Sequence, residues 1–482
     1  MRKTKIVSTL GPASNDIETI TALIHAGANV FRFNFSHGDH PEQLGRINLV
    51  KQAMKDTGIK VGLMLDTKGA EIRTGENVDD AVFHYETGDK IILTMNTGVE
   101  NVKDRIDVTY AGLFDDVEVG GQILFDDGLL GTTILSKDPK KRELTLGVQN
   151  PADLGSKKGV NAPGVSLKLK GLTDKDRDDI KFGVEQGIHF IAASFVRKPS
   201  DVQDLRDLLE EVGGQDVLII PKIESQEGIN NADEIIRLAD GVMVARGDMG
   251  VEIPYEEVPA VEQELIHKAN LIGKPVITAT QMLDSMQENP RPTRAEVTDV
   301  AFAVLQGTDA TMLSGESANG DYPVESVHTM AVIDERADKM RPLHSPVLNE
   351  LKQSGSITTT TAIAAVTAAE RVSAKAIITL TSSGYTARQI SRLKPAAPII
   401  ALTYTERTAS QLLLSWGVTP MVLPKGDAYE DLIAQAEQRL IKEGVVAAGD
   451  VIVIVVGLPL YQAGSTNNVL ISRVAEDANP EK

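Results

Sequence analysis

The sequence predicts an α/β protein with three parts: a (β/α)8 TIM barrel, a small β-barrel domain inserted into one of its loops, and a C-terminal open α/β domain. Three observations support this fold class. Short apolar runs alternate with amphipathic stretches, turn-rich segments interrupt this alternation, and it begins again after Asp338. The predicted boundaries are 1–69 with 171–340 for the barrel, 70–170 for the insertion and 341–482 for the last domain.

Each of the apolar runs is too short for a helix and has the composition of a strand that is buried on both faces. Amphipathic segments such as 18–28 and 256–272 separate most of these runs. Alternation of strands and helices over about 250 residues is typical of a parallel barrel. The predicted strands are 5–10, 30–35, 61–65, 190–195, 217–223, 242–245, 276–279 and 310–313.

The insertion alternates apolar and polar residues between turn signals such as Asp126-Asp127-Gly128, which is typical of antiparallel strands joined by tight turns. Its predicted strands include 90–95, 122–125, 132–135 and 143–148.

The last domain returns to strands followed by helices, which indicates an open α/β sheet. It begins with a predicted helix at 358–372. Its predicted strands are 376–380, 399–402, 421–423 and 451–456, and its further predicted helices are 386–393, 410–415 and 430–443.

The composition excludes several classes of function. The 482 residues carry a net charge of −19, which repels nucleic acid and anionic membranes, so we expect neither as a partner. Any bound phosphate must be held by local Lys, Arg or a metal ion. The absence of cysteine excludes disulfides, thiolate catalysis and Cys-ligated zinc. The start of the chain has no signal-peptide pattern and no apolar run reaches the length of a membrane span, which predicts a cytoplasmic protein.

Polar residues follow the predicted barrel strands, where the active sites of such barrels lie. Arg32, Asn34 and Ser36 share one face of the second strand, and the apolar residues between them bury it. A buried arginine needs a partner, which favours function over a merely solvated strand face. The third strand leads into residues 66–73, which are mostly polar; Asp66 stands at the strand end, whereas Lys68 and Glu71 suit a simple exit to the insertion.

Lys222 and Glu224 end the fifth strand, and Asp248 follows the sixth. Because neighbouring strands end at the same barrel mouth, the two carboxylates are a candidate Mg²⁺ site, with Lys222 placed to stabilise a charged transition state. The alternative interpretation is a Lys–Glu ion pair that closes the barrel. Buried charge in barrel strands is costly, so we favour the functional interpretation.

Other candidates are weaker on their own. Thr280 and Ser314 follow the last two strands, where a hydroxyl can orient a substrate or relay a proton, although structural hydrogen bonding is more usual. Lys175 begins a helix for which Thr173 is a plausible N-cap. The loop 381–386 opens a helix after a strand and suits a phosphate, but a Ser/Gly turn without a ligand explains it equally.

Taken in order, these clusters resemble the pyruvate kinase family, over essentially the whole chain. The matching motifs are 29–38 (NVFRFNFSHG), 65–75 (LDTKGAEIRTG), 221–228 (PKIESQEG), 244–254 (VARGDMGVEIP), 279–286 (ATQMLDSM), 289–299 (NPRPTRAEVTD) and 313–323 (LSGESANGDYP).

The resemblance implies transfer of phosphate from phosphoenolpyruvate to ADP, giving pyruvate and ATP, with the insertion as a lid. Glu224 and Asp248 would hold Mg²⁺ or Mn²⁺, and Asp248 would also contact the substrate. Lys222 would stabilise charge on the phosphoryl group and the enolate, and Arg32 would bind the transferring phosphate. Gly247 and Thr280 would contact the substrate. The proton donor to the enolate stays open between Thr280, Ser314 and water.

The family's nucleotide residues correspond here to Asn34, His37, Arg73 and Lys175. The resemblance also implies a K⁺ site, whose ligands match Asn34, Ser36, Asp66 and Thr67. Glu71 fits the K⁺-dependent branch, because the K⁺-independent branch places a lysine there.

The resemblance further implies an allosteric homotetramer with a sugar-phosphate or AMP effector. The effector residues would be Thr381, Ser382, Ser383, Gly384 and Thr386.

The chain departs from the family pattern at several positions. Ala70 and Lys170 replace usual prolines at the hinges of the insertion, which predicts altered lid closure. Phe302 replaces a usual Asn, Asn319 a usual Lys, and Tyr385 stands where some members have a basic residue. Since the sequence ends at Lys482, we expect it to lack the phosphohistidine-like domain of some bacterial members.

Two other functions stay open on the sequence. A Mg²⁺-dependent enolpyruvate lyase or aldolase barrel would share the Arg and the acidic pair, and ADP dependence separates it from a kinase. A catalytically inactive sugar-phosphate sensor would keep its binding after Lys222→Ala, whereas an enzyme would lose turnover.

Overall fold

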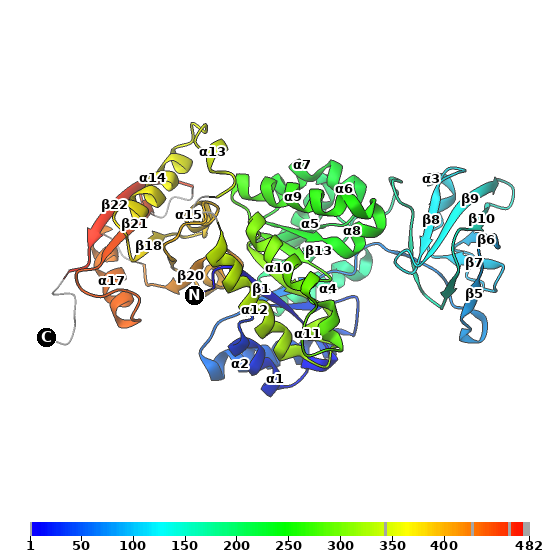
Figure 1. The fold of residues 1–482 in the computed structure, drawn as a ribbon, viewed down its shortest axis with the longest axis horizontal. Helices are drawn as coiled ribbons and strands as arrows, with labels where there is room; N and C mark the ends of the chain where they lie inside the picture. Colours follow the sequence, from blue (N-terminus) through cyan, green and yellow to red (C-terminus); the bar gives the residue numbers. More distant parts are fainter. Residues whose placement is uncertain (1, 342–344, 426–428, 461–463, 476–482) are drawn as a thin grey trace.

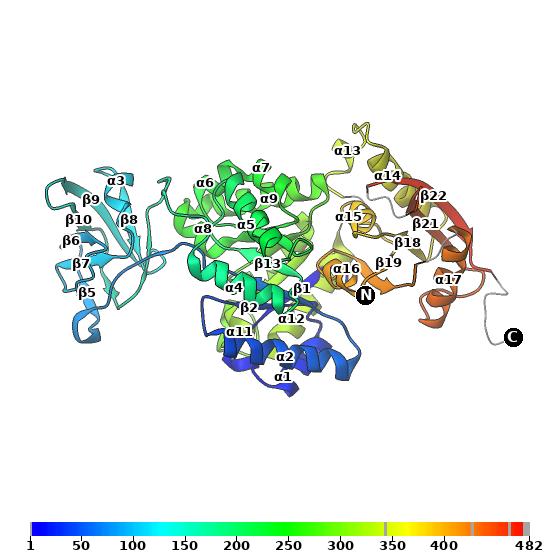
Figure 2. The ribbon, with the colours of Figure 1, turned by 180° about the vertical axis from the view of Figure 1, so that it is seen from behind.

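The computed structural model describes residues 2–341, 345–425, 429–460 and 464–475, and it shows three bodies in a row. The barrel lies in the middle, with the inserted domain and the C-terminal domain at opposite ends, as both views of the molecule show (Figures 1 and 2). Within the described ranges, no helix has the length and apolar character that crossing a bilayer requires.

The central body is the predicted parallel barrel. In the described part of the chain, eight strands close in the order β1-β17-β16-β15-β14-β13-β3-β2, and every neighbouring pair is parallel. Apolar side chains fill the interior, which explains the continuous apolar runs in the sequence. The strands are β1 (Lys5–Leu10), β2 (Val30–Asn34), β3 (Gly62–Asp66), β13 (Phe190–Ala193), β14 (Leu218–Ile223), β15 (Val242–Ala245), β16 (Val276–Ala279) and β17 (Ala310–Leu313).

Helices surround the barrel. The predicted N-cap Thr173 is confirmed: its hydroxyl accepts from the Asp176 backbone N–H, and the Asp176 carboxylate accepts from Thr173 in return. The helices are α1 (Ile17–Ala26), α2 (His40–Thr57), α4 (Asp174–Glu185), α5 (Pro199–Glu211), α6 (Gln226–Asn230), α7 (Ala232–Leu238), α8 (Arg246–Glu252), α9 (Val258–Ile272), α10 (Arg294–Gln306), α11 (Gly315–Ala318) and α12 (Pro323–Met340), with the 3-10 turns η1 (Pro12–Ser14), η3 (Tyr255–Glu257) and η4 (Asp284–Gln287).

The inserted domain is a β structure with its own apolar core. Its main sheet has the order β4-β12-β8-β9-β10-β6-β7, and a bridge between Thr74 and Val108 joins the two edges into a small barrel. One pairing differs from the expected antiparallel pattern, because β6 and β7 run parallel. The elements are β4 (Ile72–Arg73), η2 (Val78–Asp80), β5 (Phe83–Tyr85), β6 (Lys90–Met95), β7 (Arg105–Val108), α3 (Leu113–Asp116), β8 (Gln122–Phe125), β9 (Leu130–Asp138), β10 (Glu143–Val148), β11 (Ala152–Leu154) and β12 (Gly159–Asn161).

The C-terminal domain is an open sheet of order β20-β19-β18-β21-β22. The edge strand β22 was not predicted; it pairs antiparallel with β21 and mixes polar with apolar residues. The elements are α13 (Leu348–Leu351), α14 (Ile357–Arg371), β18 (Ala376–Leu380), α15 (Tyr385–Ser391), β19 (Ile399–Thr403), α16 (Glu406–Leu412), β20 (Val418–Val422), α17 (Tyr429–Lys442), β21 (Val451–Gly457) and β22 (Thr466–Arg473).

A buried ion pair joins the C-terminal domain to the bottom of the barrel. Lys394 Nζ lies 2.8 Å from Asp309 Oδ1, and both side chains are nearly inaccessible to solvent. Trp416 covers the pair: its backbone N–H donates to Asp309 Oδ1, and the Lys394 ammonium lies 5.1 Å from the centre of its ring. Burial lowers the pKa of Lys394 to about 8, although Asp309 counteracts this effect.

We expect Lys394→Met to lower the free energy of unfolding by about 3 kcal/mol, because it leaves the buried Asp309 carboxylate without its cation. Urea denaturation followed by the fluorescence of Trp416, the single tryptophan, measures this loss. The matched control is Lys339→Met, which removes an exposed lysine paired with Glu335 and should cost less than about 1 kcal/mol. Equal losses in the two variants would contradict the prediction.

Candidate active site

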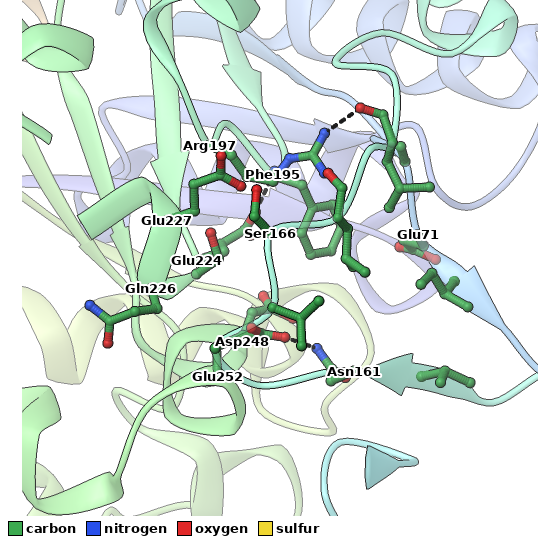
Figure 3. A pocket seen from close by; sticks show the side chains of 18 of the residues that line it. Glu71, Asn161, Ser166, Phe195, Arg197, Glu224, Gln226, Glu227, Asp248 and Glu252 are labelled. Atoms are coloured by element: carbon green, nitrogen blue, oxygen red, sulfur yellow. Dashed lines mark hydrogen bonds between the residues drawn. The ribbon is translucent and has the colours of Figure 1, made fainter. Parts of the chain in front are cut away.

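A cavity of about 360 Å³ lies between the mouth of the barrel and the inserted domain and is the candidate active site. Figure 3 shows Glu224, Asp248 and Glu252 of the barrel on one side and Asn161 of the inserted domain opposite. The barrel residues follow the carboxyl ends of β14 and β15, the position expected for a barrel active site.

Arg32 lies beside this cavity in a buried ion pair. Its Nε donates to Asp66 Oδ2 at 2.5 Å, and its NH1 donates to the Thr9 hydroxyl at 3.0 Å. Arg32 is 8% exposed and Asp66 1%. Burial opposes ionisation of Asp66, but the charges of Arg32 and Lys222 outweigh it and hold the pKa of Asp66 below its usual value. The expectation that Arg32 needs a partner is therefore confirmed.

Lys222 extends this network toward the cavity. Its ammonium lies 2.8 Å from Glu224 Oε1 and 3.5 Å from Asp66 Oδ1. Burial disfavours the ammonium, but the two carboxylates more than offset this, so the pKa of Lys222 is raised. The Lys–Glu ion pair that the sequence offered as the alternative interpretation is thus present, and it stands at the cavity wall.

Glu224 and Asp248 supply oxygen atoms suited to a hard cation. The Phe195 N–H donates to Glu224 Oε2 at 2.6 Å, whereas the buried Oε1 receives no well-directed hydrogen bond from any described residue. Burial raises the pKa of Glu224 to about 7; Lys222 opposes this rise and Asp248 adds to it. A divalent cation between the two carboxylates would reverse that shift, so the pair fits Mg²⁺ or Mn²⁺.

The remaining ligands of such an ion must come from elsewhere. The described residues contain no group of three or more His, Cys, Asp or Glu side chains arranged to hold a metal. Mg²⁺ commonly takes one or two protein carboxylates and fills its shell with water and substrate oxygens. Glu224 and Asp248, which both line the cavity, fit this coordination preference.

The inserted domain adds further carboxylate charge. Asp127 lines the cavity, and burial, followed by the nearby Asp248, raises its pKa. Burial also raises the pKa of Glu252, although the hydrogen bond from Asn161 opposes the rise. The acidic cavity therefore requires cations before it can hold an anionic substrate.

Thr280 adopts a strained backbone with φ of 71°. Its hydroxyl accepts from the Gly247 N–H at 2.7 Å, which joins two residues that the sequence assigned to the substrate. Arg246 holds this turn by donating to the Thr280 carbonyl at 2.8 Å while its guanidinium pairs with Asp299. Arg246 was not among the predicted site residues.

The predicted nucleotide residues fall into two places. Arg73 lines the cavity, where its Nε donates to Glu71 at 2.5 Å and its NH1 to the Lys157 carbonyl at 2.9 Å. Lys175 lies beside the end of β2 instead, donating to the Phe35 carbonyl at 2.9 Å and to Asp179 at 2.6 Å.

The predicted K⁺ residues lie at the ends of the neighbouring strands β2 and β3. Asn34 is the register neighbour of Asp66, and its side-chain oxygen accepts from the Ser36 N–H. His37 is exposed in the loop that follows. The predicted ligand Thr67 continues from β3, and its carbonyl accepts from the Ser194 hydroxyl at 2.6 Å.

Two further residues escaped the sequence analysis. Ser194 lies within the apolar run 190–195, directly after the end of β13, and its only signal was that it is polar. Arg197 is buried and donates to the carbonyls of Leu167 and Leu169, which anchors the returning linker of the insertion. The only sequence feature that could have predicted Arg197 is a charged residue shortly after a buried strand.

The predicted effector loop lines a small cavity of about 30 Å³ in the C-terminal domain. Gly384 takes the left-handed conformation before α15, and the Thr386 and Thr466 hydroxyls are 2.7 Å apart. None of the described lining residues is Lys or Arg.

A hydrogen bond from Asn161 Nδ2 to Glu252 Oε1, at 2.8 Å, links the inserted domain to the barrel. We expect Asn161→Asp to move the inserted domain away, because a second carboxylate would face Glu252. Small-angle X-ray scattering should show a larger radius of gyration. The double variant Asn161→Asp/Glu252→Gln restores a donor–acceptor pair and should recover the original value; an unchanged radius in Asn161→Asp would exclude a role of this contact in closure.

Comparison with known protein families gives two matches, which together cover most of the chain. Residues 1–327 match the family model described as pyruvate kinase, barrel domain, and residues 359–472 match that described as pyruvate kinase, alpha/beta domain. A pyruvate kinase of Lactobacillus delbrueckii subsp. bulgaricus is 56% identical over 97% of this chain and 80% of its own length. One of Bacillus licheniformis is 50% identical over the same shares.

The fold comparison agrees. The crystal structure of a pyruvate kinase from Cryptosporidium parvum superposes with a TM-score of 0.92 at 37% identity, covering 98% of this chain and 96% of the other.

Proposed function

This chain belongs to the pyruvate kinase family, and from that premise we propose how its own residues perform the reaction. It is a glycolytic phosphotransferase that moves the phosphoryl group of phosphoenolpyruvate to ADP and yields pyruvate and ATP. This membership sets the lyase alternative aside, and the presence of Arg32, Lys222, Glu224 and Asp248 argues against the inactive sensor. The observation that carries the residue assignment is the connected network of Arg32, Asp66, Lys222 and Glu224, which reaches the cavity through Glu224.

Arg32 and Lys222 are the proposed phosphoryl-binding cations. Arg32 is buried and the Lys222 side chain is only 11% exposed, so their charges act in a medium of low dielectric constant and reorganise little during the reaction. Asp66 orients both of them through its two carboxylate oxygens. Transfer of a phosphoryl group needs positioning and charge stabilisation and no covalent nucleophile, which agrees with the absence of cysteine.

We propose that the Lys222 ammonium also stabilises the charge on the oxygen that leaves as the enolate. Asp248, the Gly247 N–H and the Thr280 hydroxyl would orient the carboxylate end of the substrate. The Arg246 contacts keep Thr280 in its strained position.

Members of the family use a divalent metal, and those of the K⁺-dependent branch also use K⁺. We propose that Glu224 and Asp248 hold Mg²⁺ or Mn²⁺, which when bound neutralises phosphate and enolate charge. For K⁺ we propose the oxygens of Asn34, Ser36, Asp66 and Thr67, with Glu71 as the mark of K⁺ dependence; these residues cluster at the ends of β2 and β3.

ADP would be bound by Arg73 in the cavity and by Asn34, His37 and Lys175 beside it. We propose that residues 70–170 act as a lid on the barrel formed by 1–69 and 171–340. Its separate apolar core and the Asn161–Glu252 contact support this role. Closure over the substrate would exclude water from the transfer.

We also propose that the C-terminal domain, residues 341–482, binds an effector and contributes to a homotetramer. The hydroxyl-rich loop with Thr381, Ser382, Ser383, Gly384 and Thr386 suits a sugar phosphate or AMP. The outer edge of β22 pairs with no other described strand, and such an edge is a template for a second copy. A cytoplasmic location stays a prediction from the sequence.

The test is pyruvate formation by purified protein with phosphoenolpyruvate, ADP, Mg²⁺ and K⁺, repeated with each component withheld. Pyruvate that requires all four components supports the proposed sites. Pyruvate formed without K⁺ would contradict the K⁺ assignment and the argument from Glu71. Pyruvate formed without ADP would return the lyase to consideration.

A further inference from the structure

Ser194 occupies the centre of the network that surrounds Lys222. It directly follows β13 and is 5% exposed. No predicted site residue lies on β13. Its hydroxyl lies 3.1 Å from Lys222 Nζ, 3.0 Å from Asp66 Oδ1 and 2.6 Å from the Thr67 carbonyl oxygen. One hydroxyl therefore touches three groups that belong to the proposed site.

The chemistry of these contacts sets their direction. The Lys222 ammonium has only donors, so it donates to the Ser194 oxygen. Asp66 and Thr67 offer only acceptors, so the single hydroxyl proton goes to one of them. The oxygen is thereby oriented with a lone pair toward Lys222, which receives an uncharged, directional partner in addition to its carboxylates.

The backbone around Ser194 is held as firmly as its side chain. Its N–H donates to the Thr67 hydroxyl at 3.0 Å, which ties the end of β13 to the end of β3. Gly69 packs on it so closely that a Cβ there would stand 2.9 Å from the Ser194 Cβ. The position of the Ser194 hydroxyl is therefore fixed, even if the Lys222 side chain changes its conformation.

We propose that Ser194 is a positioning residue for phosphoryl transfer, which holds the Lys222 ammonium between Asp66 and Glu224. A lysine is a point charge on a flexible stem, so attraction to carboxylates alone does not specify its place. Glu224 Oε1 lies 2.8 Å from the ammonium, so without the hydroxyl the ammonium would be drawn toward Glu224. It would then be less well placed to stabilise the phosphoryl group. This inference rests on the proposed role of Lys222.

The test compares Ser194→Ala, Ser194→Val and Ser194→Thr in steady-state kinetics. We expect Ala and Val to lower kcat by about 10- to 100-fold with little change in KM for phosphoenolpyruvate, as for other residues that orient a catalytic group. Thr keeps the hydroxyl and matches Val in shape, so it should retain most of the activity. Rescue by Thr but not by Val is a result that packing alone does not produce.

The matched stability control is Ser326→Ala, which also removes a buried hydroxyl that donates to a backbone carbonyl, far from Lys222. It should change the unfolding midpoint about as much as Ser194→Ala and leave kcat unchanged. A wild-type kcat in Ser194→Ala would overturn the inference, and so would equal losses of kcat in Ser194→Thr and Ser194→Val. The proposed function would still stand in that case if Lys222→Ala were inactive. Absence of ADP-dependent turnover in the wild type would overturn both.

Discussion

Replacing Lys222 with Ala is expected to lower kcat by about 10³-fold or more, the largest effect of any single change in this chain. Groups that stabilise transition-state charge in phosphoryl transfer contribute about 10³–10⁵ in rate. Lys222 is the residue whose ammonium lies close to both Asp66 and Glu224, and Glu224 lines the cavity. The loss should appear in kcat, because the charge that it stabilises develops during the transfer.

A folding defect must be separated from this loss, since Lys222→Ala leaves two buried carboxylates close together. The double variant Lys222→Met/Glu224→Gln removes one of these charges and should unfold near the wild-type midpoint while staying inactive. Circular dichroism and thermal unfolding provide the comparison. Turnover within about tenfold of wild type in a folded Lys222→Ala protein would refute the assigned role.

The second large effect is expected from Arg32→Met, which should lose about 3–5 kcal/mol of stability and at least 10²-fold in kcat/KM for phosphoenolpyruvate. The stability loss follows because Asp66, 1% exposed, keeps its charge without the guanidinium that lies 2.5 Å away. The kinetic loss follows because the phosphoryl group loses a buried cation. Urea denaturation and steady-state kinetics measure the two losses separately.

Adding Asp66→Asn to Arg32→Met should restore most of the stability, because the unpaired charge is then absent, and should restore no activity. Arg142→Met serves as the control for removing an ion-paired arginine, since its pair with Asp115 is exposed and its loss should change the free energy of unfolding far less than the loss of Arg32. Recovery of activity in the double variant would mean that Arg32 acts only to neutralise Asp66.

The architecture was readable from short-range patterns. Buried parallel strands produce continuous apolar runs, and the eight predicted barrel strands match the structure to within one or two residues at each end. The edge strand β22 was missed for the corresponding reason: it is half exposed, and its mixture of Asn, Val, Leu and Ser lacks such a run. The parallel pairing of β6 with β7 also escaped notice, because pairing direction depends on how distant strands meet.

The site was readable only in part. A charge at the end of a buried strand marked Arg32, Lys222, Glu224 and Asp248 as candidates, because burial of an unpaired charge is too costly to be accidental. A single hydroxyl at a strand end carries no such signal, so Ser194 passed unnoticed although it contacts Lys222 and Asp66. Arg246 was read as part of a motif, without the Thr280 turn that it supports.

The sequence by itself determined the three-part α/β architecture, the family and the charged residues at the strand ends, since these follow from local periodicity, motif order and the cost of buried charge. Only the tertiary structure decided which charges meet. Barrel closure places β3 between β2 and β13, so Asp66 reaches both Arg32 and Ser194, which are separated from it by 34 and 128 positions. Partners of that kind depend on strand register, and register is a property of the closed sheet as a whole.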